Sequence, residues 1–210
     1  MATTPVVLEG TLKGAQLEEA VQISVRAFDD DPFFQYLFPS ESQRHRSVAM
    51  LHRTVLRHVA TVGVTRTASI DGKIAGLALW VPPGKWPYSP MLQIRQLFGS
   101  IAAFAPNLGS LNRGRPIMHA VVEAHPKRPQ WYLQLLMVDP PFQRHGIGGM
   151  LQTPTLEVCD REGIFAWVET QKEENLAYYQ RFGFEIVAEH RPVAAAPAMW
   201  SMGREATPAA

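Results

Sequence analysis

The sequence has 210 residues, 46% of them hydrophobic and 19% charged, and its 20 basic and 19 acidic residues leave a net charge of +1. A chain of this length and apolar content can bury a real core, which excludes wholesale disorder, and its balanced charge gives no general attraction to nucleic acid or membranes. Cys159 stands alone, which excludes a disulfide framework or a metal site built from several cysteines. With neither a signal-peptide pattern nor a membrane-spanning apolar run, we expect a cytoplasmic protein that needs no metal, nucleic acid or membrane.

The first part of the chain is expected to place a short strand before a series of helices. The strand lies at 5–9, and the next residues keep apolar side chains at helical spacing. Asp31 before Pro32 is typical of a helix cap followed by the first helical residue, so a short aromatic helix begins there. A longer helix at 42–59 has its apolar residues on one face.

The middle of the chain is expected to hold one hairpin and a broken helical stretch. Strand-like runs at 64–70 and 74–81 flank Asp71-Gly72-Lys73, and an Asp-Gly pair between such runs is a strong signal for a tight hairpin. Glycines and prolines then punctuate 82–124, which we interpret as helical but interrupted. This stretch is either a set of packing helices or a lid that faces the substrate.

The last third has the most regular pattern. It alternates strands with helices and then adds two more strands, at 131–138, 147–162, 165–170, 175–182, 184–189 and 198–202. The final two strands make the sheet mixed rather than purely parallel. No linker separates this third from the rest, so we expect a single domain at 1–205 and a flexible tail at 206–210.

A glycine-rich turn, Gln143-Arg-His-Gly146-Ile-Gly148-Gly149, joins a strand to a helix in this last third. Backbone N–H groups at the start of a helix bind anions such as a diphosphate, and the cationic Arg144 and the His145 side chain add donors. The turn lacks the Gly-Lys-Ser/Thr ending of a P-loop, and it comes late in the chain without the glycine spacing of a dinucleotide fold. The pattern therefore predicts a site for a different phosphate-bearing ligand.

Two segments around this turn carry longer motifs. The first is Val138-x-Pro followed by Gln143-x-x-Gly146-x-Gly148, and it resembles motif A of the GNAT superfamily of acyl-CoA-dependent N-acyltransferases. The second runs Asn175-Leu-Ala-Tyr-Tyr179-Gln-Arg-Phe-Gly-Phe and resembles motif B of the same superfamily, Asn-x-x-x-Tyr-x-x-x-Gly-Phe. Within the superfamily, residues 125–202 are most similar to the puromycin N-acetyltransferase relatives.

The resemblance implies an α/β fold with a mixed, mostly antiparallel twisted sheet, splayed central strands and flanking helices. It makes 125–205 the half that binds acetyl-CoA and 1–124 the half on the side of the acceptor. Acetyl-CoA is then the co-substrate, and the acceptor is a primary amine of a small molecule. A protein amine as acceptor and a non-catalytic acyl-CoA-binding regulatory module are the alternatives. The chain is expected to be a monomer or a homodimer.

The resemblance also implies roles for individual residues. The main-chain N–H of Val138 holds the oxyanion that forms when an amine attacks the thioester, and Tyr179 protonates the departing sulfur. The resemblance, together with the donors of the glycine turn, predicts that the coenzyme is bound by Met137, Val138, Gln143, Arg144, His145, Gly146, Ile147, Gly148, Gly149, Asn175 and Tyr179.

A base is also required, because an alkyl ammonium group has a pKa of about 10.4 and carries its proton at neutral pH. Glu169 is the first candidate, since the resemblance puts it beside the acyl site. His119, Glu123 and His125 precede the central strand and are weaker candidates. A water relay to bulk solvent is the remaining alternative.

Other polar residues have simpler interpretations beside their functional ones. Asn175 either caps its helix or binds the coenzyme, and Tyr178 is read as aromatic packing. The run Asp29 to Asp31 either attracts a cationic acceptor or, at Asp31, only caps a helix. The basic residues between 44 and 58 are interpreted as a solvated helix face rather than a nucleic-acid site.

Overall fold

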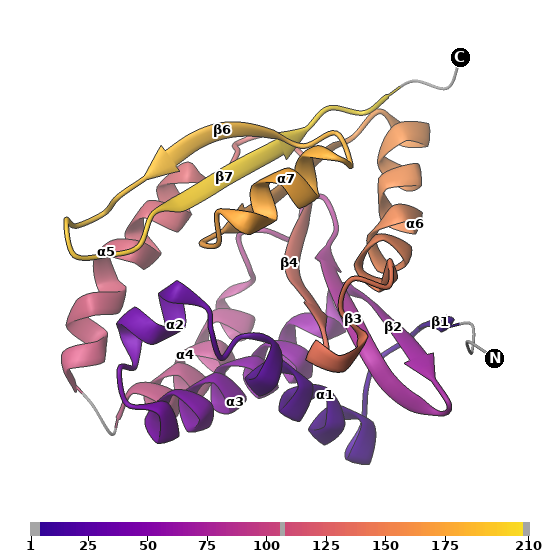
Figure 1. Ribbon diagram of the computed structural model, residues 1–210. Helices are drawn as coiled ribbons and strands as arrows, with labels where there is room; N and C mark the ends of the chain where they lie inside the picture. Colours follow the sequence, from indigo (N-terminus) through magenta and orange to yellow (C-terminus); the bar gives the residue numbers. More distant parts are fainter. Residues whose placement is uncertain (1–4, 106–107, 208–210) are drawn as a thin grey trace.

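The structure, a computed structural model, describes residues 5–105 and 108–207 (Figure 1). A seven-stranded sheet has the order β1-β2-β3-β4-β5-β7-β6. β4 and β5 are parallel, and the other neighbouring strands are antiparallel. The predicted mixed, mostly antiparallel sheet is confirmed. The strands are β1 (Val6–Glu9), β2 (Val64–Ile70), β3 (Lys73–Val81), β4 (Gln130–Val138), β5 (Phe165–Thr170), β6 (Glu185–His190) and β7 (Met199–Arg204).

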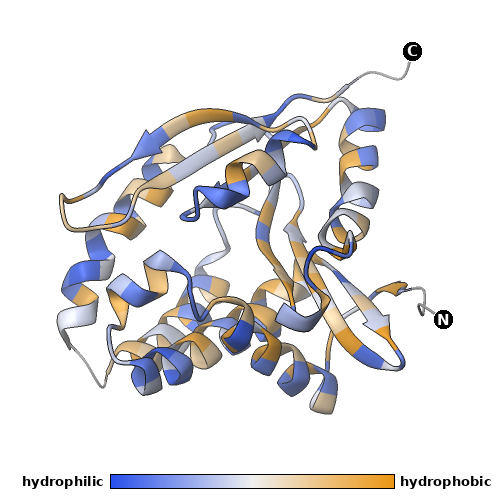
Figure 2. Cartoon of the chain, in the orientation of Figure 1, coloured by the Kyte–Doolittle hydropathy of each residue, from blue (hydrophilic) through white to orange (hydrophobic). Residues whose placement is uncertain are grey.

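Helices cover both faces of this sheet, and the apolar residues in Figure 2 gather on the central strands and on helix faces. Side chains of β3 alternate between two cores, as expected for a strand. Leu77 and Leu79 join the core with α1 and α3, whereas Ala78 and Trp80 join the core with α6 and α7. The helices are α1 (Gly14–Ala27), α2 (Pro32–Leu37), α3 (Glu41–His58), α4 (Pro90–Phe104), α5 (Leu108–Ala124), α6 (Ile147–Glu162) and α7 (Glu174–Gln180), with short 3₁₀ turns η1 (Val59–Thr61) and η2 (Pro140–Phe142).

The predicted hairpin is present between β2 and β3. Ile70 pairs with Lys73 across a two-residue turn. Asp71 and Gly72 have φ values of 50° and 76°, the left-handed conformations that such a turn requires and that Asp-Gly tolerates. The hairpin brings β3 into the centre of the sheet, beside β4.

The middle of the chain differs from the predicted series of interruptions. α4 is continuous, and Gly114 and Pro116 lie inside the continuous helix α5. Contacts with α2 hold α5 despite the missing N–H of the proline, because Ser110 Oγ and Arg113 Nη2 both donate to the Leu37 carbonyl at 2.7 Å. These bonds favour packing helices over a mobile lid.

The sheet connects the two halves expected from the sequence, since β1 to β3 come from the first half and β4 to β7 from the second. The expected tail at 206–210 lies only partly within the described residues. Thr207 is the last of the described residues, and its N–H donates to the Asp160 carboxylate on α6 at 2.7 Å. Within residues 5–105 and 108–207, the helices are too short or too polar to cross a bilayer.

Candidate active site

The strands β4 and β5 separate after a short parallel ladder. Their pairing joins residues 130–132 to residues 165–167. Further along β4, the Asp139 N–H donates to the Ala75 carbonyl on the β3 side at 2.9 Å. Because successive residues of a strand point their N–H groups to opposite sides, the Val138 N–H faces the gap that opens toward β5. The splayed strands thus leave a backbone donor at the position where the sequence predicted one.

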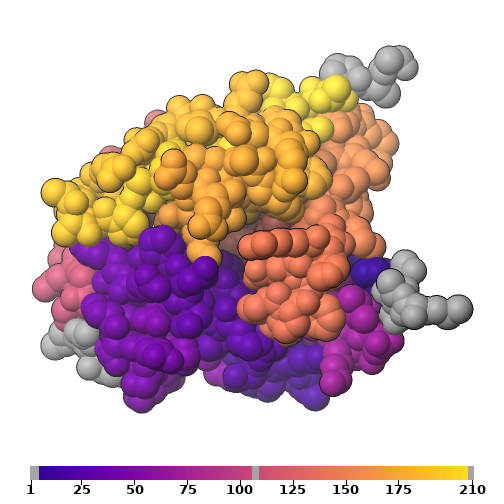
Figure 3. Space-filling view, viewed as in Figure 1, coloured from indigo at the N-terminus to yellow at the C-terminus, as the bar shows by residue number. Residues whose placement is uncertain are grey.

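A cavity of about 710 Å³ lies beside the glycine turn. Figure 3 shows the surface hollowed between the segment that carries α7 and the turn before α6. Of the residues predicted to bind the coenzyme, His145 and Tyr179 do not line this cavity, which we call the coenzyme cavity after that prediction. The other predicted residues line it: Met137, Val138, Gln143, Arg144, Gly146, Ile147, Gly148, Gly149 and Asn175.

The glycine turn directs backbone donors into this cavity. Gly146 precedes α6 with a φ of 78°, and Met150 donates to its carbonyl at 3.1 Å in the first intrahelical bond. The N–H groups of residues 147–149 therefore belong to the first turn, which intrahelical bonds leave open. A Cβ built on Gly148 would lie 2.5 Å from the Tyr178 hydroxyl, so any larger residue at this wall would have to displace the Tyr178 ring.

Charge and shape at the turn fit a diphosphate. Arg144, Lys172 and Arg181 line the same cavity as the open N–H groups. The Gln143 side chain donates from Nε2 to the Val138 carbonyl at 3.1 Å and so shapes the turn. His145 instead is exposed and is bonded through Nδ1 to the Gln143 carbonyl at 2.7 Å, which explains why its ring is outside the cavity.

The two neighbouring tyrosines of α7 have different surroundings. Tyr178 lines the cavity, and its hydroxyl accepts a bond from Gln152 Nε2 at 3.0 Å. Tyr179 is 6% exposed, packs against Phe184, and has its pKa raised by burial. Aromatic packing is therefore only part of what Tyr178 does. Tyr178 and Tyr179 are three and four residues from Asn175, so both lie near its face of the helix and no local signal separates the two tyrosines.

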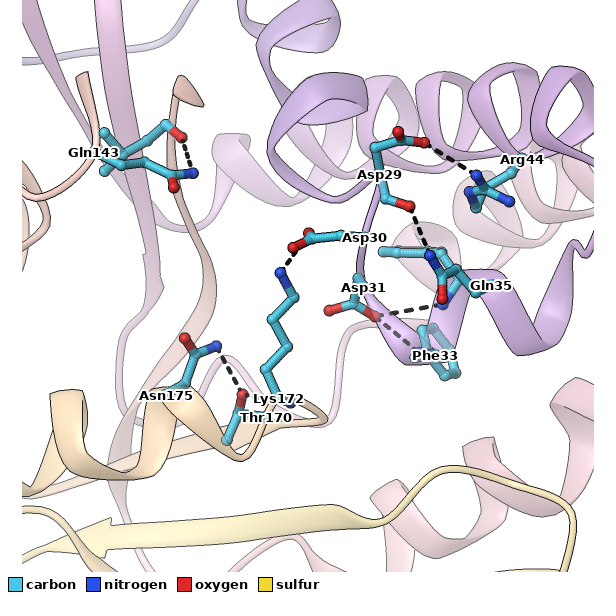
Figure 4. A network of polar contacts seen from close by, with 12 residues as sticks. Asp29, Asp30, Asp31, Phe33, Gln35, Arg44, Gln143, Thr170, Lys172 and Asn175 are labelled. Atoms are coloured by element: carbon cyan, nitrogen blue, oxygen red, sulfur yellow. Dashed lines mark hydrogen bonds and ion pairs between the residues drawn. The ribbon is translucent and has the colours of Figure 1, made fainter. Parts of the chain in front are cut away.

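Asn175 is the second residue of α7 and not its cap. Its Nδ2 donates to Thr170 Oγ1 at 3.0 Å, which ties α7 to the end of β5 (Figure 4). Of the two alternatives for Asn175, the structure excludes the cap, and Asn175 lines the cavity while holding the helix in place.

Glu169 lies in a buried cluster on β5, with a side chain only 5% exposed. The Trp167 indole N–H donates to its carboxylate, and His125 Nδ1 is 3.6 Å from the same oxygen. His125 Nε2 is 2.7 Å from Gln130 Nε2. With the amide donating, His125 accepts at Nε2 and carries its proton on Nδ1, facing Glu169.

Tyr88 and Gln134 extend this cluster toward the gap. Tyr88 donates to Gln134 Oε1 at 2.5 Å, and burial together with the Glu169 charge raises the pKa of Tyr88. Continuing the parallel register would put Gln134 opposite Glu169, where the strands begin to part. A second cavity of about 660 Å³ borders the cluster at His125 and Gln130. The cluster thus lies along β4 between the two cavities.

Of the weaker base candidates, His125 joins Glu169, and the other two do not. His119 and Glu123 lie on α5, expose about 70% of their side chains and pair with each other at 3.1 Å. Among residues 5–105 and 108–207, no group of three or more His, Cys, Asp and Glu side chains is arranged to hold a metal ion.

The three consecutive aspartates point in different directions, as Figure 4 shows. Asp29 pairs with Arg44 of α3 at 3.1 Å, and Asp31 accepts bonds from the first N–H groups of α2. Asp30 pairs with Lys172, which follows β5, and both line the coenzyme cavity. This ion pair links the two halves of the chain at the edge of the cavity.

Comparisons with known proteins agree with this geometry. The model of the acetyltransferase (GNAT) family matches residues 25–184. An uncharacterized N-acetyltransferase of Schizosaccharomyces pombe is 25% identical over 174 residues, which are 80% of this chain and 70% of that protein.

Solved structures share the fold. A Corynebacterium glutamicum protein described as histone acetyltransferase HPA2 and related acetyltransferase has a TM-score of 0.70 at 21% identity, with 98% of this chain and 97% of that one covered. The PaiA N-acetyltransferase of Thermoplasma acidophilum, solved in complex with coenzyme A, has a TM-score of 0.56 at 10% identity, with 95% and 99% covered. Because the family model spans most of the sequence, including both motifs, this chain belongs to the acetyltransferase (GNAT) family, whose fold uses acetyl-CoA, and it is an acyltransferase.

Proposed function

We propose that this acyltransferase moves the acetyl group of acetyl-CoA to the primary amine of a small molecule, by direct attack of the amine. The observation that carries the proposal is the buried pair of Glu169 and His125 beside the gap between β4 and β5. An amine with a pKa of about 10.4 must lose a proton before it attacks. In this proposal the Glu169 carboxylate takes that proton, and the His125 ring, whose Nδ1 lies 3.6 Å from it, holds the carboxylate in position.

The residues on the coenzyme side have complementary roles in this proposal. Bound acetyl-CoA supplies an activated acyl carbonyl. The Val138 N–H donates to the carbonyl oxygen as it gains negative charge, an effect worth roughly 10²- to 10³-fold in comparable sites. As the new C–N bond forms and the C–S bond breaks, Tyr179, whose ring packs against the cavity-lining Tyr178 ring, is assigned to give a proton to the sulfur. The nitrogen of the new amide returns a proton to the Tyr179 phenolate. Burial raises the pKa of Tyr179, so its hydroxyl still holds its proton at neutral pH.

Burial of the cluster supports a small acceptor. The side chains of Glu169 and His125 are 5% and 3% exposed, and the Trp86 ring lies 4.6 Å from the His125 ring. The ion pair between Asp30 and Lys172 further narrows the approach along the coenzyme cavity. We expect a slender amine to reach groups as enclosed as these more readily than a lysine that brings a folded protein surface with it.

Acylation of a protein amine is the second candidate. The observation that favours it is the similarity to the Corynebacterium glutamicum protein, whose description names a histone acetyltransferase. Membership of an acetyltransferase family favours either enzyme over a non-catalytic acyl-CoA-binding module. The similarity of residues 125–202 to puromycin N-acetyltransferase relatives and the cytoplasmic location stay predictions.

Thiol release from acetyl-CoA tests the acceptor class. The panel pairs small primary amines with peptides that carry the same amine on a lysine side chain or at the N-terminus. We expect kcat/KM for the preferred small amine to exceed that of its peptide partner at least tenfold. A preference of the same size for the peptides would overturn the small-molecule assignment in favour of a protein acceptor.

A further inference from the structure

α4 is apolar on two opposite faces, and one of them is covered by α3. On the covered face, Leu92 and Ala103 are buried, and the Ala103 carbonyl accepts a bond from Ser47 of α3 at 2.8 Å. A side chain on Gly99 would overlap Thr54, so the two helices are in close contact there. Figure 1 shows α4 on the far side of α3.

The opposite face of α4 carries large apolar side chains that are 50–68% exposed. This α4 face consists of Met91, Ile94, Leu97, Phe98 and Ile101. Arg95 is the one charged residue among the fifteen of this helix. An apolar stripe on a surface helix normally faces a core or a partner. The exposed apolar surface is on the order of 600 Å², at the upper limit of what a monomer usually shows.

We propose that the α4 face is the interface at which a second copy of this chain docks, with α4 packed against its symmetry mate across a twofold axis. In a twofold interface the same patch meets itself, which suits an apolar stripe that has no charges to match. A standard interface buries about 800 Å² on each partner, so the roughly 600 Å² of apolar surface on the α4 face supplies most of the area required.

A membrane surface fits the α4 face less well than a second copy of the chain. An interfacial membrane helix places several lysines and arginines on its polar face. The face of α4 opposite the stripe instead packs on α3, and Arg95 is the helix's single basic residue.

Sedimentation equilibrium of the full chain tests the proposal. We expect a species of twice the 23.4 kDa chain mass at micromolar concentrations. Phe98→Asp and Ile94→Asp should each weaken dimerisation at least 100-fold, because both copies bring a charge into the same apolar contact. The matched control is Val6→Asp on β1, where Val6 is 57% exposed, and it should leave the dimer intact. Circular dichroism and thiol release verify that every variant is folded.

A cross-link locates the interface independently of the charge variants. Cys159 is the only cysteine of the sequence and is buried, so an added cysteine is the one that reacts. Phe98→Cys should give a covalent dimer on mild oxidation, and Val6→Cys should not. A wild-type monomer at 100 µM would overturn the proposal, as would a dimer that both aspartate variants retain. Flotation of the wild type, but not of Phe98→Asp, with anionic phospholipid vesicles would assign the α4 face to a membrane instead.

Discussion

The coenzyme cavity and the Glu169 cluster lie along the same two strands but are built from different groups. The cavity depends on backbone N–H groups of one short turn, 146–149, and on glycines that let a ligand come close. The cluster depends on side chains from separate segments, with Tyr88, His125 and Gln134 gathered around Glu169. The first region is therefore sensitive to added volume, whereas the second is sensitive to the loss of single polar atoms.

Added volume at the turn should have the largest effect. Gly148→Val would push a branched side chain into the Tyr178 hydroxyl, and we expect coenzyme A affinity to fall at least 100-fold by isothermal titration calorimetry. Gly10→Ala, where nothing lies within 4 Å, is the control and should bind normally.

A double variant sharpens this test. If the clash with the hydroxyl causes the loss, Gly148→Ala should bind more weakly than wild type, and adding Tyr178→Phe should recover part of the affinity. Unchanged binding in Gly148→Val would remove the turn from the coenzyme site.

The next largest effect concerns the carboxylate of the cluster. Glu169→Gln keeps an oxygen for the Trp167 indole but lacks the proton acceptor, so we expect kcat to fall about 100-fold. Coenzyme A affinity should change less than twofold. The rival candidate gives the control, since Glu123→Gln on the exposed face of α5 should be as active as wild type. A fall in kcat in Glu123→Gln, with normal activity in Glu169→Gln, would instead identify Glu123 as the base.

The two tyrosines of α7 provide a smaller and more discriminating comparison. We expect Tyr179→Phe to lower kcat about tenfold with coenzyme affinity little changed, and Tyr178→Phe to leave kcat within twofold. Burial raises the pKa of Tyr178 to about 12 and that of Tyr179 still further, so neither should produce an alkaline decline below pH 9. A loss confined to Tyr178→Phe would make Tyr178 the proton donor.

The smallest expected effect is on the helices that support the acceptor side. His52 of α3 packs against Phe28 and Phe34, and burial lowers its pKa to about 4. The unfolded chain takes up a proton near pH 6.5 and the folded chain does not. Stability is therefore full above pH 6.5 and declines as the pH falls toward 4. The free energy of unfolding should drop by about 1 kcal/mol between pH 7 and 5.5 because of this one group.

Urea unfolding at both pH values measures that decline. The difference between pH 7 and 5.5 should be about 1 kcal/mol smaller in His52→Gln than in wild type, because glutamine does not titrate. An identical difference in both proteins would show that His52 binds a proton as readily in the folded chain as in the unfolded chain. Coenzyme A affinity is assigned to residues 125–205, so its change with pH should be the same in His52→Gln and in wild type.

Several elements were predictable because their signals are local. The Asp71-Gly72 pair requires only its own left-handed backbone, and the β2–β3 hairpin follows from it. Gly146 and Gly148 mark the start of α6 and its open N–H groups without reference to distant residues. The prediction failed at α5, where bonds to the Leu37 carbonyl hold a helix that Gly114 and Pro116 alone would weaken.

The sequence by itself determined the family, the glycine turn and most of the strands and helices, because motif spacing and periodicity act within a few residues of chain. Only the tertiary structure decided that Tyr178 rather than Tyr179 lines the cavity and that His125 is the candidate base that meets Glu169. It also decided which face of α4 is left uncovered. These outcomes depend on side chains that are far apart in the sequence, and their contacts are set by how the helices pack on the sheet.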